Sequence, residues 1–291
     1  KESANTLKGT FLTVLGIAQD AGFPQAACQK ECCQIVWKHR HERRLVSCLA
    51  IVDMESNSAW MFDATPDFKD QLFQLEHIES GVKTNLAGIF LTHAHIGHYT
   101  GLMHLGREVM GSQQVPVYAM PKMKSFLENN GPWSQLVSLK NIELIGLQND
   151  STIVLDKPFR VTPLQVPHRD EFSETVGFRI EGPEKKALFI PDINKWQLWE
   201  RNIVEEIQKV DYAFLDGSFY QNGEIPGRDM SEIPHPFLVE SMEIFKELSE
   251  EDKAKVHFIH FNHTNPLLWN KDRQTELQKA GYNYARTGMS L

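Results

Sequence analysis

The sequence has no long hydrophobic run and few cysteines, and both deficits narrow the class of protein. No stretch approaches the roughly 20 apolar residues that a membrane-spanning helix needs. Only four cysteines occur in 291 residues, and three of them lie between positions 28 and 33, which does not indicate a disulfide framework. Basic residues are also in deficit, with 30 Lys and Arg against 38 Asp and Glu and a net charge of −8. This balance argues against nucleic acid as the main partner.

The remaining composition is typical of a globular protein with a substantial core, at 41% hydrophobic and 23% charged residues. No repeat or long linker divides the chain, so we expect one domain over residues 1–291. Because the chain begins with Lys1 and not Met, we expect a segment to have been removed upstream. We expect a soluble protein, either periplasmic after removal of a signal peptide or cytoplasmic. Its oligomeric state is open, and a homodimer is one alternative.

Short apolar runs recur along the chain, and most are four to eight residues long and rich in Val, Ile, Leu and Phe. Runs of this length and composition are typical of buried strands. The predicted strands are residues 11–17, 45–52, 59–62, 87–91, 115–119, 159–166, 187–190, 212–215 and 256–259.

Three segments between these runs have apolar residues at helical spacing, which predicts amphipathic helices. The first begins at Thr65-Pro66, a cap followed by a first-turn proline, and the third begins at Pro236. The second begins at Asn194 and is predicted to place four residues on one buried face: Trp196, Trp199, Ile203 and Ile207. Many strands with few helices predict an α/β or α+β fold, with two packed sheets and helices outside.

Residues 91–98 read Leu-Thr-His-Ala-His-Ile-Gly-His and follow an apolar strand directly. His93 and His95 alternate on one side of an extended chain, and His98 follows as the chain begins to coil. Three imidazole nitrogens can then converge on a Zn²⁺-type metal ion. The alternative is that these are core or surface histidines that are adjacent by chance.

Four further strands end at a residue that can bind a metal. These residues are His168, Asp192, Asp216 and His260. A single polar residue after a strand is usually a turn residue or a helix cap. Because five strands of one chain end in this way, the pattern favours a metal centre at the strand ends.

The order and spacing of these residues resemble the metallo-β-lactamase superfamily, whose motif is H-x-H-x-D-H followed by a His, an Asp and a His on separate strands. The resemblance implies an α+β fold, an αββα four-layer sandwich with two metals at the strand ends. The implied ligands are His93, His95, His98, His168, Asp192 and His260.

A narrower similarity covers residues 16–25, 216–219 and 260–266, which resemble the family of coenzyme PQQ biosynthesis protein B. That family in turn resembles the cyclic phosphodiesterases of phosphonate breakdown, whose relatives hold a structural zinc with N-terminal cysteines and a C-terminal His. The resemblance implies a structural zinc site here at Cys28, Cys32, Cys33 and His263. Cys32 is then displaced, because the family's middle cysteine falls on Lys30. Alternatively, one or two of these cysteines are ordinary buried thiols, as we expect for Cys48.

Gly97 departs from the superfamily pattern, because it stands where the motif has Asp. The second metal then keeps His98, His260 and Asp192, and we expect it to bind more weakly. Asp20, in the loop before the cysteines, is either an ordinary loop residue or a partial replacement for the missing carboxylate. A hydrolase short of its second metal is expected to gain activity from Gly97→Asp. The PQQ family differs again, since it keeps the Asp and lacks the leading histidines, so we expect a different chemistry.

These residues predict a metal-dependent hydrolase in which a metal-bound hydroxide attacks a small-molecule substrate. We expect a phosphodiester or cyclic phosphate, with a carboxylic ester or lactone as the next choice. Catalytic roles fall to Asp192, which would bridge the metals, to His98, and to Asp216, which would orient a ligand imidazole. The expected cofactor is Zn²⁺, one ion structural and one or two at the active centre, with Fe or Mn as alternatives.

Two other functions are open. One is an iron oxygenase close to PQQ biosynthesis, and the other is a non-catalytic binding protein that metals stabilise. Arg169 is either a clamp for phosphate or carboxylate or a surface arginine. We expect the pocket walls to come from loops 19–25, 168–174 and 221–235.

Overall fold

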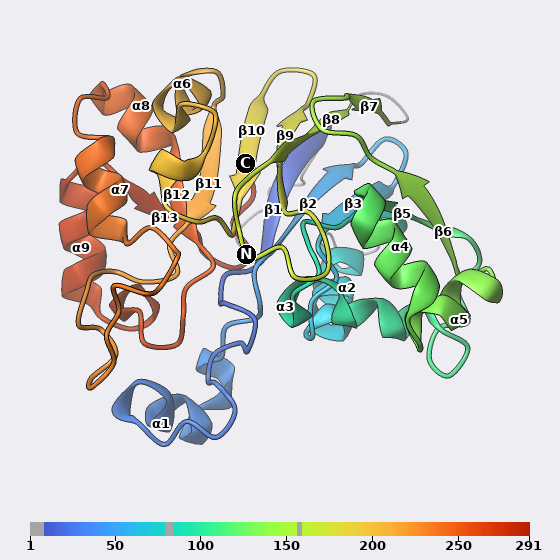
Figure 1. Cartoon of the computed structure of the whole chain (residues 1–291), viewed down its shortest axis with the longest axis horizontal. Coiled ribbons are helices and arrows are strands. Elements are labelled where there is room, and N and C mark those ends of the chain that lie inside the picture. The colour runs from blue at the N-terminus through green and yellow to red at the C-terminus, as the bar shows by residue number, and fades with distance from the viewer. Residues whose placement is uncertain (1–8, 79–83, 156–158) are drawn as a thin grey trace, which may run out of the picture.

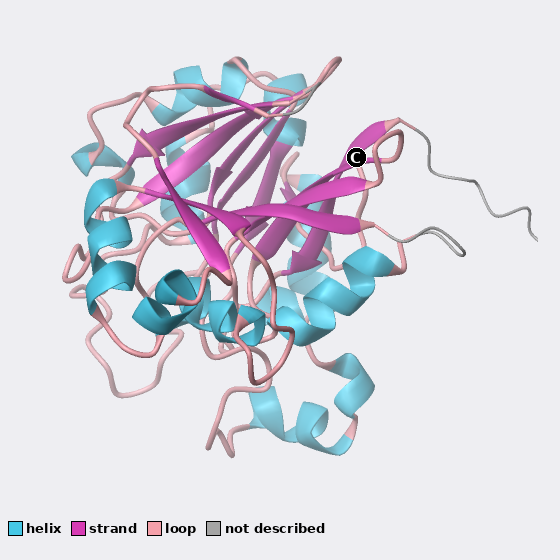
Figure 2. Cartoon of the chain, turned by 90° about the vertical axis from the view of Figure 1, so that its right-hand side faces the viewer, coloured by secondary structure: helices cyan, strands magenta, loops and turns pink. Residues whose placement is uncertain are grey.

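Two β-sheets pack face to face, and helices cover the outer face of each, in the computed structural model (Figures 1 and 2). The structure describes residues 9–78, 84–155 and 159–291. This arrangement confirms the predicted αββα sandwich of mixed α and β content.

The first sheet contains six strands in sequence order, antiparallel from β1 to β3 and parallel from β3 to β6. Parallel neighbours end at the same edge of a sheet, so the residues after β3 and β4 lie close together. The strands are β1 (Thr10–Gly16), β2 (Cys48–Asp53), β3 (Ser58–Phe62), β4 (Asn85–Phe90), β5 (Val115–Ala119) and β6 (Ile142–Gly146).

The second sheet contains seven strands in reverse sequence order, antiparallel from β7 to β10 and parallel from β10 to β13. The carboxyl ends of β10, β11 and β12 therefore share one edge. The strands are β7 (Ile153–Val154), β8 (Arg160–Gln165), β9 (Val176–Glu181), β10 (Lys186–Ile190), β11 (Tyr212–Asp216), β12 (Val256–Ile259) and β13 (Asn283–Tyr284).

The helices are short, and the longest that the structure describes have nine residues. None of the helices in the described ranges is long and apolar enough to cross a bilayer. The α-helices are α1 (Glu31–Lys38), α2 (Phe68–Glu76), α3 (Ile96–Tyr99), α4 (Pro121–Asn129), α5 (Trp133–Ser138), α6 (Ile203–Gln208), α7 (Leu238–Ile244), α8 (Glu250–Lys255) and α9 (Lys271–Lys279). The 3₁₀ turns are η1 (Arg40–Glu42), η2 (Thr100–Leu105), η3 (Trp196–Leu198) and η4 (Pro266–Leu268).

Strands β1, β2 and β3 of the first sheet are buried on both faces, which explains their continuous apolar runs. In β2, Leu49 and Ile51 pack between the two sheets, whereas Cys48 and Val52 face the helices outside the first sheet. Cys48 is completely buried, as predicted for a core thiol.

Two local predictions are wrong. The segment from Asn194 is not one helix, because Trp199 is extended and Asn202 starts a new helix by accepting a hydrogen bond from the backbone N–H of Val204. Four strands lie outside the predicted set, and β9 is missed because Gly177 and Arg179 interrupt its apolar pattern. Gly177 is needed there, since a Cβ would lie 2.6 Å from the side chain of Ile190.

Candidate metal centre

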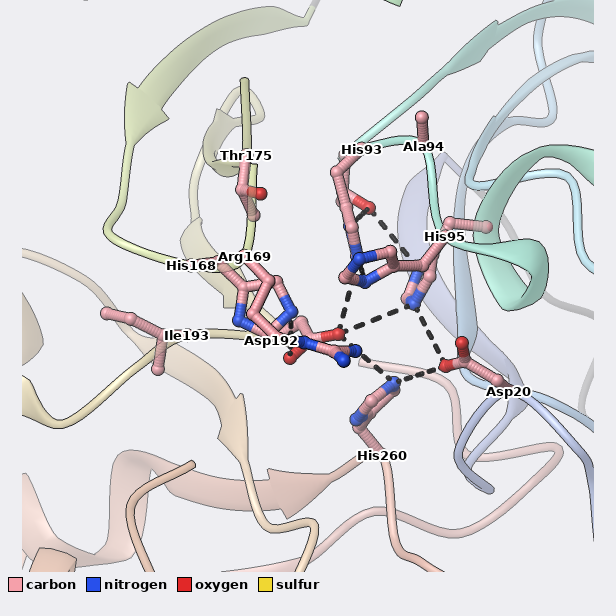
Figure 3. A network of polar contacts seen from close by, with 12 residues as sticks. Asp20, His93, Ala94, His95, His168, Arg169, Thr175, Asp192, Ile193 and His260 are labelled. Atoms are coloured by element: carbon pink, nitrogen blue, oxygen red, sulfur yellow. Dashed lines mark hydrogen bonds and ion pairs between the residues drawn. The ribbon is translucent and has the colours of Figure 1, made fainter. Parts of the chain in front are cut away.

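The carboxyl ends of strands from both sheets meet at one edge of the sandwich, and the predicted ligands converge there (Figure 3). His93 follows β4, His168 follows β8, Asp192 follows β10 and His260 follows β12. His98 joins them from α3. The edge therefore gathers donors that lie up to 167 positions apart, from His93 to His260.

Four donors form a first donor group, in which the ligand atoms all lie within 4.8 Å of one another: His93, His95, His168 and Asp192. The Nε2 atom of His93 lies 3.3 Å from Asp192 Oδ2, and His168 Nε2 lies 3.3 Å from Asp192 Oδ1. His95 turns its Nδ1 atom to within 2.8 Å of His93 Nε2. Tetrahedral coordination at about 2.1 Å separates ligand atoms by about 3.4 Å, so the group has dimensions that suit a zinc-sized ion.

A second donor group, defined by the same spacing, contains Asp20, His98, Asp192 and His260. Asp20 Oδ1 lies 3.4 Å from the Nε2 atoms of both His98 and His260. Asp192 Oδ2 completes the group at 3.7 and 3.8 Å from the same two nitrogens. Because Oδ2 also faces His93, the carboxylate of Asp192 lies between the two groups and can serve both.

The buried polar atoms without hydrogen-bond partners indicate what these groups are suited to hold. Four such atoms face the centre: the Nε2 atoms of His98, His168 and His260 and Oδ1 of Asp192. Leaving a buried polar atom unpaired costs about 1–3 kcal/mol. A divalent cation removes this cost at several atoms together, so the residues fit a metal ion.

Hydrogen bonds behind the imidazoles fix which nitrogen faces the centre. His98 Nδ1 lies 2.7 Å from Asp63 Oδ2, and His260 Nδ1 lies 3.0 Å from Ser218 Oγ. His168 Nδ1 lies 3.2 Å from Asn194 Oδ1. With Nδ1 engaged, Nε2 is the nitrogen that each imidazole can offer to a metal, which would displace any proton there.

Asp63 is a positioning residue that the sequence analysis missed. It is fully buried, and it accepts hydrogen bonds from the backbone and hydroxyl of Thr92 as well as facing His98. Asp63 directly follows a predicted strand, so the strand-end rule that found Asp192 would also have found it. Asp63 and His260 both have positive φ, 74° and 67°, a conformation that costs a non-glycine residue energy and is common at functional sites.

Burial and neighbouring charges set the protonation of the centre. Burial and the neighbouring His98 lower the pKa of His93 well below its usual value. Burial also disfavours charge on His98, but the carboxylates of Asp63 and Asp20 outweigh it and raise its pKa. Burial alone would raise the pKa of Asp192, yet the histidines around it, His168 first, hold it well below the usual range. The centre therefore keeps an ionised carboxylate among nitrogen donors, which a cation can bind by displacing protons.

Asp216 does not orient one of the predicted ligand imidazoles, and this prediction is corrected. Its Oδ2 atom lies 2.8 Å from Nδ1 of His235, a buried histidine from the loop after β11. His235 Nδ1 also lies 3.3 Å from Asp192 Oδ1. Burial opposes charge on His235, but Asp216 and Asp192 raise its pKa to about 9. His235 was missed because no strand ends at it.

Gly97 leaves space for Asp20, which overturns the expected effect of Gly97→Asp. A Cβ atom at position 97 would lie 2.6 Å from Cα and 2.7 Å from Cγ of Asp20. An aspartate therefore cannot be added at this position while the Asp20 loop keeps its place. The second donor group has four donors and not the three expected from the sequence.

The four residues of the predicted structural zinc site also come together, and we call them the thiol site: Cys28, Cys32, Cys33 and His263. Neighbouring sulfurs are 3.9 and 4.0 Å apart, and His263 Nδ1 lies 3.4 and 3.6 Å from two of them. A tetrahedral zinc with Zn–S bonds of about 2.3 Å separates sulfurs by about 3.8 Å. The dimensions suit such an ion. Figure 1 shows that α1, which carries two of the cysteines, projects from the sandwich.

The three loops expected to line the pocket each bring a side chain to the centre. Asp20 and His235 come from the first and the last, and Glu171 of the middle loop lies 3.0 Å from His95 Nε2. Arg169 is 58% exposed, and its guanidinium lies 4.0 Å from the carboxylate of Glu171. Its role as a clamp stays a prediction.

Known proteins resemble the chain over nearly its full length. Coenzyme PQQ synthesis protein B of Cupriavidus necator is 25% identical over 313 residues, which cover 97% of this chain and 99% of that protein. The protein of the same name from Klebsiella pneumoniae is 26% identical and covers 97% of each.

Solved structures share the fold. Zn²⁺-bound PqqB from Methylobacterium extorquens superposes with a TM-score of 0.80 at 20% identity, over 97% of this chain and 99% of that one. A diphosphatase from the PhnP family gives 0.67 at 24% identity, over 97% and 96%. The family profile of the beta-lactamase superfamily domain matches residues 60–261, which include every donor of the first donor group. Since this match spans more than half of the chain, the protein belongs to the beta-lactamase superfamily.

Proposed function

We propose that the protein is a metal-dependent hydrolase whose centre binds two divalent cations, one at each donor group. The observation that carries this proposal is the pair of donor groups that share Asp192, with unpaired buried nitrogen and oxygen atoms facing between them. Because the two groups share the carboxylate of Asp192, each divalent cation would keep net positive charge and could expand its coordination to take up a further ligand. A purely structural site would normally be closed by its protein ligands.

Cations held in these groups would supply Lewis acidity and lower the pKa of water towards about 7. The chain's own residues hold and orient the reacting partners. Asp192 fixes the separation of the two groups, and Asp63 and Ser218 fix the imidazoles of His98 and His260. The proton that His235 shares with Asp216 lies beside Asp192, so the hydrogen bond holds both carboxylates in place.

A phosphodiester or cyclic phosphate is the substrate class that fits two adjacent cation groups best. Two cations a few ångströms apart can each bind one oxygen of a phosphoryl group and balance its charge. The side chains of His95 and Asp20 are partly exposed, at 14% and 26%, whereas those of His98 and His260 are buried, so a substrate would meet the centre on the side of His95 and Asp20. The fold shared with a PhnP-family diphosphatase is compatible with this class. A carboxylic ester or lactone is the second choice.

Zinc is the cation that we propose for the thiol site, because three cysteines and a histidine form a closed tetrahedral set. The same ion suits the first donor group, and manganese or iron suits the mixed nitrogen and oxygen donors of both groups at the centre.

The test is turnover of bis-p-nitrophenyl phosphate by protein loaded separately with zinc, manganese or iron. We expect His95→Ala to lower the rate by more than about 100-fold, since it removes a ligand and not merely a partner of one. The matched control is His77→Ala, an exposed histidine on the far end of α2, which should leave the rate unchanged. No turnover of any phosphodiester, ester or lactone by the fully loaded protein would refute the proposal.

A redox role close to PQQ synthesis is the second candidate, and the full-length similarity to proteins of that name favours it. In that case the purified protein should contain iron and consume oxygen. Cations at the thiol site alone, with neither turnover nor oxygen consumption, would instead indicate a binding protein.

A further inference from the structure

We infer that Asp20 is a ligand of the second cation, that Gly97 is the residue that admits it, and that the thiol site anchors the loop that carries it. This inference rests on the proposed function only in requiring a cation at the second donor group. It assigns to Asp20, in the space that Gly97 leaves, the task that the superfamily motif gives to an aspartate at position 97.

The position of Asp20 comes from a turn at the end of β1. The turn is closed by a hydrogen bond of 2.8 Å from the backbone N–H of Gly22 to the backbone carbonyl oxygen of Gln19. Asp20 lies at the first corner of this turn, with its carboxylate directed at His260 (Figure 3). The side chain is 26% exposed, whereas its partners His98 and His260 are completely buried. Asp20 thus closes the second donor group from the solvent side.

Backbone pairing links this turn directly to the His260 strand. The N–H of Phe261 bonds to the oxygen of Ile17 and the N–H of Gln19 bonds to the oxygen of Phe261, both at 2.8 Å. Asp20 directly follows Gln19, and His260 directly precedes Phe261. Two donors that are 240 positions apart in sequence are therefore held by a two-bond ladder between their neighbours.

Gly97 provides the space that Asp20 occupies. A Cβ at position 97 would meet Cα, Cγ and Oδ1 of Asp20 at 2.6, 2.7 and 2.8 Å. Gly97 lies inside α3, where alanine would normally be favoured by roughly 1 kcal/mol over glycine. A helical glycine that is in contact with a donor is explained if the donor must approach this closely.

The thiol site links the two chain segments that carry Asp20 and His260 a second time. Cys28 lies eight residues after Asp20, and His263 lies three residues after His260. A cation that joins Cys28 to His263 thus closes a ring that includes Asp20, the ladder and His260. Without that cation, the loop that carries Asp20 would be less ordered. Binding of the second cation would then have to order Asp20 as well, so the second cation would bind more weakly.

The test counts bound cations and uses a double-mutant cycle of Asp20→Ala and Gly97→Ala. Each protein is dialysed against a fixed free zinc concentration and analysed for zinc, and the dissociation constant of the weakest site is measured by titration. We expect about three cations per chain in the wild type, one for each of the two donor groups and one for the thiol site, and none between Asp192, Asp216 and His235, where His235 is hydrogen-bonded to Asp216. Each single variant should hold two, or bind the third at least about 10-fold more weakly. The double variant should match the singles, because both substitutions remove the same ligand.

Two controls keep the result unambiguous. Glu31→Gln changes an exposed acid on the projecting segment and should bind zinc as the wild type does. Thermal unfolding of each variant reports whether it folds, and Gly97→Ala should melt no higher than the wild type, although alanine favours the helix.

Wild-type zinc affinity in Asp20→Ala would overturn the assignment, and so would additive losses in the double variant. The outcome is separate from that of the proposed function, because it is read from zinc content. A chain with three cations, a sensitive third site and no hydrolysis of any substrate would retain this inference and reject the hydrolase.

Discussion

The candidate metal centre and the thiol site are built in opposite ways. The centre takes its donors from strand ends of a rigid sandwich, and a hydrogen bond from behind holds most of its imidazoles. The thiol site takes two of its donors from α1, a helix of eight residues that projects from the body and has no side-chain cap at its start (Figure 1). One backbone N–H, of Gln25, contacts a sulfur, at 3.4 Å from Cys33.

The two sites differ in what supplies the free energy that orders their donor residues. Packing and hydrogen bonds hold the donors of the centre in place, as the proposed hydrolysis would require. The projecting segment has few such contacts, so its cation must supply the free energy that orders it. Burial raises the pKa of Cys33 to about 12, and it also raises that of Cys32. These thiols stay protonated at neutral pH until a cation displaces the protons, which again makes the ion the organising element.

The largest expected effect follows from removing Asp192, because its carboxylate serves both donor groups. Asp192→Ala should lower hydrolysis by more than about 100-fold and remove both centre cations, while the thiol site keeps its own. Elemental analysis and turnover measure the two effects. The control is Asp211→Asn, a half-exposed carboxylate before β11 that pairs with Lys185 and belongs to neither site. Complete loss of the thiol cation from Asp192→Ala would mean that the projecting segment is not held by its own cation.

A substitution at the thiol site should give a different pattern. Cys33→Ser should lose one cation and unfold the projecting segment, while the sandwich stays folded. We expect fast proteolytic cleavage within residues 25–44, detected by mass spectrometry, and little change in the far-ultraviolet signal of the sheets. Zinc affinity at the second donor group should fall as well, and that at the first should not. The matched control is Cys48→Ser, which changes a buried thiol of the sandwich and should lower global stability without local cleavage. Equal protease resistance of Cys33→Ser and wild type would show that the segment needs no cation to order it.

The hydrogen bonds behind the imidazoles can be tested at Asp63. Asp63→Asn keeps the shape but replaces the carboxylate that faces His98, so the second cation should bind about 10- to 100-fold more weakly. Asp53→Asn is the matched control, since Asp53 is also buried, at the end of β2, and its carboxylate holds only the turn at Ser56. Titration with zinc distinguishes them. Equal zinc affinity of the two variants would mean that the hydrogen bond from Asp63 does not position His98 for the cation.

Strand ends could be predicted from the sequence, and with them most of the centre. Apolar runs that end in His or Asp found His168, Asp192 and His260, because a strand fixes the direction of the residue that follows it. The same rule applied to Asp63 would have added the residue that holds His98. The two-sheet fold followed from the many short runs and the resemblance, although β9 was hidden by its glycine and arginine.

Loop residues could not be predicted in the same way. The sequence left two alternatives for Asp20, because its place at the centre depends on the pairing of residues 17–19 with Phe261, a contact across most of the chain that no local pattern encodes. His235 lies in a long loop after β11, and its position depends on Asp216. The segment from Asn194 was predicted as one helix because its apolar spacing continues across Asn202, where the capping hydrogen bond of that residue interrupts it.

The smallest effect concerns Glu224, which borders a cleft of about 1380 Å³ between the projecting segment and the body. Burial raises the pKa of Glu224 to about 7, and its carboxylate accepts hydrogen bonds from Thr264 Oγ1 and the backbone N–H of Tyr220. The folded chain therefore binds this proton more tightly than the unfolded chain does. The resulting stability is fully present below about pH 4.5 and is lost as the pH rises through about 7.

Glu224→Gln should remove this pH dependence. The free energy of unfolding of the variant, relative to the wild type, should rise by about 2 kcal/mol between about pH 4.5 and 8, less than the full shift implies because the cleft admits water. Urea unfolding at several pH values measures the difference, in which the titration of all other groups cancels. Glu232→Gln, an exposed glutamate of the same loop, should follow the wild type. If this difference in the free energy of unfolding did not change with pH, water would fill the cleft freely and the projecting segment would not shield Glu224. The segment would then be held to the body by its cation alone.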